Sequence, residues 1–387
     1  MASRRTIGFV AGGSAVAVVA AAGIAWAATG AGRDESPGAG PPVADDPGVA
    51  PAPLGDATAL ADDFLDNWID DGRVVRRDQG DDTVSEGQAY GLLIALGAGR
   101  EDDFDQIWSW TQENLVRDDG LLAWQWDDGG VVDDEPASDA DLDAARALVL
   151  AGDRFGRDDL TADGVTLAGD ILDTMTVTTS FGRILLPGLW AVEEQPYAYN
   201  PSYASPVAYD VLAEATGDAR WTELSEGSAA ITSHILDETA LPSDWVQVNA
   251  DGSVDPMPGA RGGGDAVVFG FDAARMPLRY AESCTDSEVA LAARTLPALD
   301  RTDDIAAVLD LGGTALTEDR HPLTVLARAA AASAAGDARA AEADLRAASE
   351  LSAEFPTYYG RAWVAIGSLM LTGDTLASCG TLEGPSA

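Results

Sequence analysis

The most informative segment of the chain is Thr83-Val84-Ser85-Glu86-Gly87-Gln88-Ala89-Tyr90-Gly91. Ser85 followed three residues later by Gln88 has the spacing of a capping box, in which two side chains satisfy free N–H groups at the start of a helix. An apolar run follows directly. The pattern therefore predicts a helix that opens at Ser85 and covers residues 85–98.

Glu86 and two glycines are the unusual residues of this helix. An acidic side chain in the first turn favours the helix dipole, and this is the structural interpretation of Glu86. Gly87 and Gly91 have poor helix propensity, which that interpretation leaves unexplained. Glycines at these two positions predict that another helix or a ligand closely approaches the backbone.

The chain from Asp56 onward repeats the helical spacing of apolar residues. Strand signals are short and sparse, as at residues 246–248. Many helices with short connections pack as hairpins side by side. Besides 85–98, the predicted helices cover residues 59–68, 102–115, 139–155, 160–175, 203–216, 219–236, 265–280, 287–296, 322–334, 338–353 and 357–371.

Such hairpins fit two arrangements, a closed toroid and an open solenoid. The Ala-rich stretch 328–350 resembles a repeat hairpin. However, the chain has no fixed sequence period, which solenoids usually show. The prediction is an all-α fold in which paired helices close into a toroid.

Two further acidic motifs accompany predicted helices. Ser138 and Asp139 precede an Ala/Leu-rich segment, and either could simply be its N-cap. Asp272 and Arg275 lie one turn apart, so they can form a structural ion pair on a helix face. Pro277 is expected to kink or interrupt that helix.

The three motifs share one geometry, because each places a carboxylate near a helix N-terminus. In a toroid the starts of the inner helices can meet, so Glu86, Asp139 and Asp272 would line one cleft. Glycoside hydrolysis needs one acid to protonate the leaving oxygen and one base to activate water. A helix N-terminus lowers a carboxyl pKa, so Glu86 can be the acid only where burial and a negative neighbour, for which Asp139 is the candidate, outweigh that effect.

The charge balance excludes several partner classes. The formal net charge is −42, from 23 basic residues, all of them Arg, and 65 acidic residues. Nucleic acid needs neutralising cations, so it is not an expected partner, and anionic membranes and polyanions are disfavoured. A neutral or cationic polymer remains allowed. The 10 Trp residues suit a ligand groove as well as a core.

The N-terminal part reads as an export segment and a linker. Paired arginines precede a long Ala/Val/Gly-rich apolar run, so residues 1–29 are predicted to be an export signal. Ala25-Trp26-Ala27 offers a cleavage site, which would make the protein secreted. The run over residues 7–28 is also long enough to remain as a membrane anchor. Residues 30–55, rich in Gly, Pro and Ala, are predicted to be a flexible linker before a folded domain over 56–380.

No cofactor or metal site is expected. Cys284 and Cys379 lie in no CxxC spacing, and His234 and His321 are far apart in sequence. No nucleotide or redox motif appears. In an exported protein the two cysteines could form one disulfide or remain free thiols. We expect a monomer.

The run Ser85–Gly91 resembles the signature around the proton donor of glycoside hydrolase family 8. The resemblance covers roughly residues 56–375. Further matching motifs follow in the order of the family: Phe104, Trp108 and Trp110; Gly120-Leu121-Leu122-Ala123-Trp124; Ala137-Ser138-Asp139-Ala140-Asp141; Asn200-Pro201-Ser202-Tyr203; Pro242-Ser243-Asp244-Trp245-Val246; Phe271-Asp272-Ala273-Ala274-Arg275; and Thr357-Tyr358-Tyr359-Gly360.

The resemblance implies an (α/α)6 toroid that cleaves β-1,4-linked glycans by an inverting, endo-acting mechanism. It implies Glu86 as the proton donor, Asp272 as the base that activates water, and Asp139 as the residue that holds the distorted sugar. It further implies that Arg275 orients Asp272 and that Tyr203 helps to fix the water.

Substrate binding and the departures from the family complete the expectation. Trp124 and Trp190 are implied as stacking platforms for sugar rings, whereas Trp108 and Trp110 are assigned to the core. Phe271 stands where the family often has Tyr. The alternatives to a cellulase are a hydrolase of the same fold acting on chitosan, xylan or mixed-linkage glucan, and a non-catalytic glycan-binding helical protein.

Overall fold

A computed structural model of the chain describes residues 56–193, 195–264, 266–283, 285–373 and 375–376. The predicted export segment and linker lie outside the described residues. So do Cys284 and Cys379, so the predicted disulfide stays a prediction. The described part begins with Asp56, whose carboxylate caps the first helix.

Helices make up most of the described part. The α-helices are α1 Ala57–Trp68, α2 Ser85–Ala98, α3 Glu101–Asn114, α4 Ser138–Phe155, α5 Asp158–Thr174, α6 Pro206–Thr216, α7 Arg220–Glu238, α8 Met276–Ala281, α9 Asp286–Ala293, α10 Leu296–Leu299, α11 Pro322–Ala334, α12 Ala338–Glu354 and α13 Tyr358–Thr372. Two 3-10 turns join them, η1 Leu189–Ala191 and η2 Ala273–Arg275.

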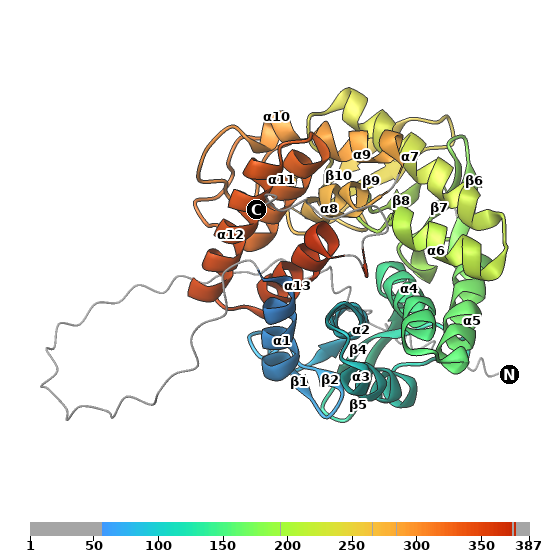
Figure 1. The fold of residues 1–387 in the computed structure, drawn as a ribbon. Helices are drawn as coiled ribbons and strands as arrows, with labels where there is room; N and C mark the ends of the chain where they lie inside the picture. The colour runs from blue at the N-terminus through green and yellow to red at the C-terminus, as the bar shows by residue number, and fades with distance from the viewer. Residues whose placement is uncertain (1–55, 194, 265, 284, 374, 377–387) are drawn as a thin grey trace, which may run out of the picture. The chain divides into compact units, whose positions relative to one another are not determined.

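The helices close into a ring of hairpins (Figure 1). An inner ring runs through α2, α4, α6, α8, α11 and α13, each in contact with the next, and α13 returns to α2. The other long helices pack outside this ring, as α5 does on α4 and α12 on α11. The contact between the last and first inner helices confirms the closed toroid and rules out the open solenoid.

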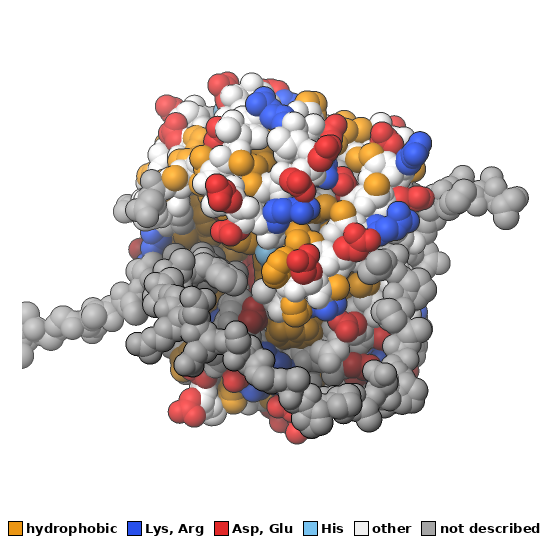
Figure 2. Space-filling model, turned by 90° about the vertical axis from the view of Figure 1, so that its left-hand side faces the viewer, with side chains coloured by type: hydrophobic (Ala, Val, Ile, Leu, Met, Phe, Trp, Pro, Cys, Tyr) orange, Lys and Arg blue, Asp and Glu red, His pale blue; other side chains and the backbone are white. Residues whose placement is uncertain are grey.

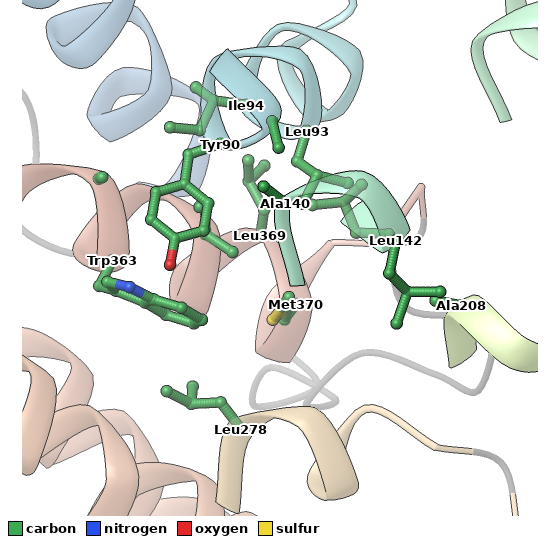
Figure 3. Packing of buried hydrophobic residues seen from close by; sticks show 14 of the residues in the cluster. Tyr90, Leu93, Ile94, Ala140, Leu142, Ala208, Leu278, Trp363, Leu369 and Met370 are labelled. Carbon is green, nitrogen blue, oxygen red and sulfur yellow. The ribbon is translucent and has the colours of Figure 1, made fainter. Parts of the chain in front are cut away.

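The core lies where the inner helices meet (Figure 3). Tyr90 of α2 and Trp363 of α13 meet edge to face, with ring centroids 5.3 Å apart. Leu142 of α4, Ala208 of α6 and Leu278 of α8 point into the same buried cluster. Because side chains from distant segments fill one centre, burial of this apolar surface supplies the main force that closes the ring.

Two buried ion pairs join α4 to the α8 segment inside the ring. Arg279 contacts both carboxylate oxygens of Asp143 at 2.8 and 2.5 Å. Arg146 contacts both oxygens of Glu282 at 2.8 and 2.9 Å and also donates to the Leu376 carbonyl at 2.6 Å. We call Asp143–Arg279 and Arg146–Glu282 the inner ion pairs.

Short antiparallel strands line the connections between helices. They are β1 Ile69–Asp70, β2 Arg73–Val74, β3 Thr83–Val84, β4 Ala123–Asp127, β5 Gly130–Pro136, β6 Thr176–Thr179, β7 Gly182–Leu185, β8 Tyr197–Tyr199, β9 Trp245–Val248 and β10 Val254–Met257. Strand β4 lies between β3 and β5, and β9 lies between β8 and β10. The sequence predicted only the strand at 246–248, because two- to five-residue strands leave little periodicity.

The predicted capping box is wrong. The N-cap of α2 is Val84, without a side-chain cap bond. Gln88 instead accepts from the Val74 amide at 2.6 Å and donates to Thr111 at 2.8 Å. The polar side chain therefore ties α2 to β2 and α3, a tertiary use that local spacing cannot distinguish from capping.

The prediction of close approach at the two glycines is confirmed. A Cβ on Gly87 would lie 2.8 Å from the Tyr358 hydroxyl, and one on Gly91 would lie 2.8 Å from a Val74 methyl. By contrast, the predicted helix over 265–280 is wrong in its first half: helical structure starts only at Ala273, and Pro277 sits in the first turn of α8 rather than interrupting it. Proline is well tolerated there because first-turn amides need no partner within the helix.

Two surface properties of the described part bear on partners. Acidic side chains are spread over the face shown in Figure 2, with arginines between them. None of the helices in the described ranges is both long and apolar enough to cross a membrane.

Candidate active site

Three acidic side chains lie at the starts of inner helices. Glu86 is the second residue of α2, and Asp139 is the second residue of α4. Asp272 immediately precedes η2, which continues into α8. The predicted common geometry of these three carboxylates is therefore present.

Arg275 brings the three carboxylates together. Its Nη1 contacts Glu86 Oε2 at 3.1 Å and Asp139 Oδ2 at 2.8 Å, and its Nη2 contacts Asp272 Oδ1 at 2.6 Å. Arg275 is only 1% exposed and Asp139 only 4%, whereas the Glu86 side chain is 23% exposed. We call Glu86, Asp139, Asp272 and Arg275 the catalytic cluster, after the roles that the sequence predicts for them.

Two hydroxyls complete the surroundings of the guanidinium. Arg275 Nη1 donates to the Tyr90 hydroxyl at 3.1 Å, and its Nε donates to Ser202 Oγ at 3.2 Å. Ser202 is held in turn by Asn200 Oδ1 at 2.8 Å. The arginine is thus fixed by α2, α4, the η2 segment and the loop at 200–203, which gives its three carboxylates defined positions.

Asp272 has a second hydrogen-bond donor. Trp245 Nε1 donates to Asp272 Oδ2 at 3.1 Å, so each carboxylate oxygen of Asp272 is held by a different group. The neighbouring Asp244 accepts from the backbone amides of Gly270 and Ala273, both at 2.8 Å. A Cβ on Gly270 would lie 2.7 Å from Asp244 Oδ2, so this loop fits closely around the Asp244 carboxylate.

The acids of the site are tuned by burial. Burial raises the pKa of Glu86 to about 7, against the opposing charge of Arg275 and with added repulsion from Asp139 and Asp272. Burial also raises the pKa of Asp139. For Asp244, burial and then repulsion by Asp272 raise the pKa to about 7. A carboxyl that holds its proton near neutral pH suits a general acid.

Tyr203 faces the catalytic cluster. The Arg275 guanidinium lies 5.2 Å from the centre of its ring, and the Trp245 ring lies 5.9 Å away. Burial, followed by the charges of Asp139 and Asp272, raises the pKa of Tyr203 well above its ordinary value. Its hydroxyl therefore keeps its proton and can donate a hydrogen bond.

Phe271, the residue before Asp272, packs in a cluster of aromatic rings. Phe271 packs against His321 and Tyr359, with ring centroids 5.0 and 6.4 Å away. The Tyr359 hydroxyl donates to the Phe271 carbonyl at 3.0 Å. The chain therefore positions this segment by packing on the Phe271 ring and by a bond to its backbone.

The two tryptophans assigned to sugar binding differ in their surroundings. Trp124 lies on β4 and is half-buried, without an aromatic or cationic neighbour among the described residues. Trp190 lies in η1, 6.3 Å from Trp245, with the Arg261 guanidinium over its ring at 4.7 Å. In the described ranges, no cluster of three or more His, Cys, Asp or Glu side chains is arranged to hold a metal ion.

The arrangement of acids on inner helices agrees with a match to a family model. Residues 62–302 match the model of glycosyl hydrolases family 8. The chain belongs to this family. The predicted family, the toroidal fold and the glycoside hydrolase class are thereby confirmed.

Relatives of this family 8 chain include named endoglucanases. A probable endoglucanase of Novacetimonas hansenii is 33% identical over 216 residues, which is 54% of this chain and 62% of the relative. The match thus spans less than two thirds of that protein's length.

Solved structures share the toroid of this family 8 chain. The endo-β-1,4-glucanase CMCax from Acetobacter xylinum has a TM-score of 0.66 at 24% identity, covering 83% of this chain and 98% of that one. A β-1,3-1,4-glucanase from Paenibacillus sp. X4 has a TM-score of 0.70 at 17% identity, covering 85% and 94%. At these identities the likeness shows the fold alone.

The sequence predicted the catalytic cluster of this family 8 chain, but it did not identify the residues that hold the cluster in place. Trp245 and Asp244 belong to a motif that the resemblance included, yet neither received a role. Tyr90 and Ser202 likewise lie inside quoted motifs. Position within a family motif was the only signal for these four residues, because none of them is adjacent to its partner in sequence.

Proposed function

We propose that the protein is an endo-acting β-1,4-glucanase that hydrolyses cellulose or a related β-glucan with inversion at the anomeric carbon. The observation that carries the proposal is the catalytic cluster, in which one buried guanidinium contacts three carboxylates. Such a group of acids, two of them partly exposed, suits acid–base hydrolysis of a glycosidic bond.

Glu86 is the general acid. Its pKa of about 7 keeps it protonated at mildly acidic pH, so it can donate to the leaving glycosidic oxygen. Asp139 contributes by its negative charge, which adds to the raised pKa of Glu86. Asp139 also lies beside Arg275, where it is proposed to accept a hydrogen bond from a hydroxyl of the distorted sugar.

Asp272 is the base that removes a proton from the attacking water. Arg275 and Trp245 fix its two oxygens, and the hydroxyl of the nearby Tyr203 is proposed to help hold the water. Glu86 and Asp272 contact different nitrogens of one guanidinium, so the two carboxylates lie close enough to act on the same glycosidic bond.

The substrate is a neutral β-glucan that lies over Trp124 and Trp190. Aromatic faces pack on the apolar faces of β-linked glucose rings. The names of the relatives, endoglucanase and endo-β-1,4-glucanase, support this class. Mixed-linkage glucan is the second candidate because a β-1,3-1,4-glucanase shares the fold. Xylan and chitosan remain outcomes of the test.

The site of action is proposed to be outside the cytoplasm. The sequence of residues 1–29 supports export, with cleavage after the Ala25-Trp26-Ala27 segment. N-terminal sequencing of protein from the culture medium checks this. An intact N-terminus in the membrane fraction would instead support retention as an anchor.

The deciding experiment follows the anomers of fresh products by NMR during digestion of a soluble cello-oligosaccharide. The α-anomer must appear first if the enzyme inverts, because the substrate is β-linked. A parallel panel of carboxymethyl-cellulose, mixed-linkage glucan, xylan and chitosan, read as released reducing ends, identifies the substrate. Initial β-anomer contradicts inversion, and no release from any polymer contradicts the enzyme.

A further inference from the structure

A hollow of about 360 Å³ lies beside Trp190. Its lining combines aromatic, apolar, amide and charged side chains, among them Trp190, Glu193, Gln247, Met257 and Arg261. An aromatic surface next to polar side chains that can bond hydroxyls is the composition expected of a sugar subsite.

The hollow adjoins the catalytic cluster through one face of the β8–β9–β10 sheet. Trp245 and Gln247 are two residues apart on β9, so they project from the same face. Trp245 bonds Asp272 and lies 6.3 Å from Trp190, while Gln247 lines the hollow. A glycan that reaches Asp272 along this face therefore passes the hollow.

Arg261 places a positive charge in this hollow. Its guanidinium lies 4.7 Å from the Trp190 ring centre, a cation–π arrangement. Within the described ranges Arg261 forms no ion pair or hydrogen bond. The chain has a net charge of −42, yet among its described carboxylates none lies within bonding distance of this cation, at a place where substrate would lie.

The loop that carries Arg261 is folded tightly by glycines. Gly262 and Gly264 adopt positive φ angles of 71° and 132°. A Cβ on Gly259 would lie 2.0 Å from the Gly263 carbonyl oxygen. These backbone constraints present Arg261 to the hollow without help from side-chain bonds.

We propose that Arg261 sets the charge preference of this subsite, so that glycans with carboxylate substituents bind better than glycans with ammonium groups. The inference rests on the proposed function, because it assigns the hollow to the same substrate. Glu193 lines the hollow with the opposite charge and makes no ion pair with Arg261, so it works in the opposite direction. An exposed pair of opposite charges contributes about twofold to fivefold in affinity.

The test compares two soluble polymers of matched length and degree of substitution, anionic carboxymethyl-cellulose and neutral hydroxyethyl-cellulose. The readout is the ratio of kcat/KM on the first to that on the second. Arg261→Ala should lower this ratio about twofold to fivefold, and Arg261→Glu should lower it further. Glu193→Gln should raise it. Added salt should shrink all three differences, because screening weakens exposed charges.

The matched control is Arg339→Ala, which removes the same charge from the exposed surface of α12. Its ratio should equal that of the unmodified protein. If Arg339→Ala and Arg261→Ala change the ratio equally, net charge is responsible and the proposal is wrong. An unchanged ratio in both Arg261 variants also overturns it.

A binding measurement separates this inference from the proposed function. Affinity electrophoresis in gels containing each polymer, with Glu86→Gln as the background, reports the same charge ratio without turnover. If the protein hydrolyses neither polymer and Arg261→Ala still shifts the binding ratio, the result supports the subsite and contradicts the proposed glucanase activity. If hydrolysis is normal and Arg261→Ala leaves the binding ratio unchanged, the result supports the glucanase activity and contradicts the subsite.

Discussion

Apart from Glu86 on α2, the catalytic cluster and the inner ion pairs lie on the same two segments, α4 and η2–α8 with its flanking residues, yet they balance charge differently. Asp139, Asp143 and Arg146 follow one another at helical spacing on α4, opposite Arg275, Arg279 and Glu282. Each inner pair matches one arginine to one carboxylate through two bonds. In the catalytic cluster one arginine serves three carboxylates.

The difference separates structure from chemistry. In each inner ion pair the buried charges are matched through two hydrogen bonds, so the pair can hold the two segments at a fixed distance. In the catalytic cluster three carboxylates share one arginine, and burial together with repulsion from Asp139 and Asp272 raises the pKa of Glu86, so it holds its proton to higher pH. The matched pairs therefore suit a structural role, whereas the unmatched carboxylates of the catalytic cluster suit the proposed proton transfer.

The largest expected effect comes from removing the proton donor. Glu86→Gln should lower kcat about 10²- to 10⁴-fold while binding of the glycan persists. Initial rates of reducing-end release and affinity electrophoresis measure the two quantities. Near-normal turnover in this variant would show that Glu86 is not the general acid. The functional difference between the catalytic cluster and the inner ion pairs would then be unsupported.

Breaking an inner ion pair should instead reduce stability. Asp143→Asn leaves the Arg279 charge buried without its partner, which costs about 3–5 kcal/mol of unfolding free energy. The double variant Asp143→Leu/Arg279→Met should recover most of that loss because no charge is left unmatched. Urea unfolding followed by Trp fluorescence measures both. Equal losses in the single and double variants would contradict a balanced pair.

The two arginines of α8 and its preceding turn form a matched pair for substitution. Arg275→Lys should lower kcat about 10²-fold, because a lysine ammonium cannot hold three carboxylates and the catalytic groups shift. Arg279→Lys should change kcat much less, although the fold loses some stability. A similar loss of kcat in both variants would show that the inner pair also controls the chemistry.

The smallest expected effect is a shift in pH dependence. The raised pKa of Glu86 predicts that kcat/KM falls as pH rises through about 7, since the acid form is then lost. Asp139→Asn removes a negative neighbour, so the pKa of Glu86 decreases and this limb moves to lower pH. Profiles of kcat/KM against pH check the direction. A shift to higher pH would mean that Asp139 does not act through its charge.

The sequence predicted what local patterns and ordered motifs encode. Helix periodicity identified the long helices, and α2 lies exactly where expected at Ser85–Ala98. The motif order predicted that Glu86, Asp139, Asp272, Arg275 and Tyr203 share one site, and they lie together in the structure. Their roles in the reaction stay predictions.

The remaining features depend on contacts between distant segments. Gln88 looked like a capping residue but bonds β2 and α3, and Asp244 bonds the loop before η2 across 26 residues or more. The covering of Trp190 by Arg261 likewise joins two loops with no shared pattern. A single sequence carries no local signal for such pairs.

The closing of the ring by α13 also has a consequence for synthesis. The last helix of the described part supplies Trp363, which packs against Tyr90, and Tyr90 accepts a bond from Arg275. During synthesis the three carboxylates of the catalytic cluster therefore emerge before Trp363, the residue that packs on the Tyr90 ring beside Arg275. The catalytic cluster would take its final form only once α13 has been synthesised and has packed against α2.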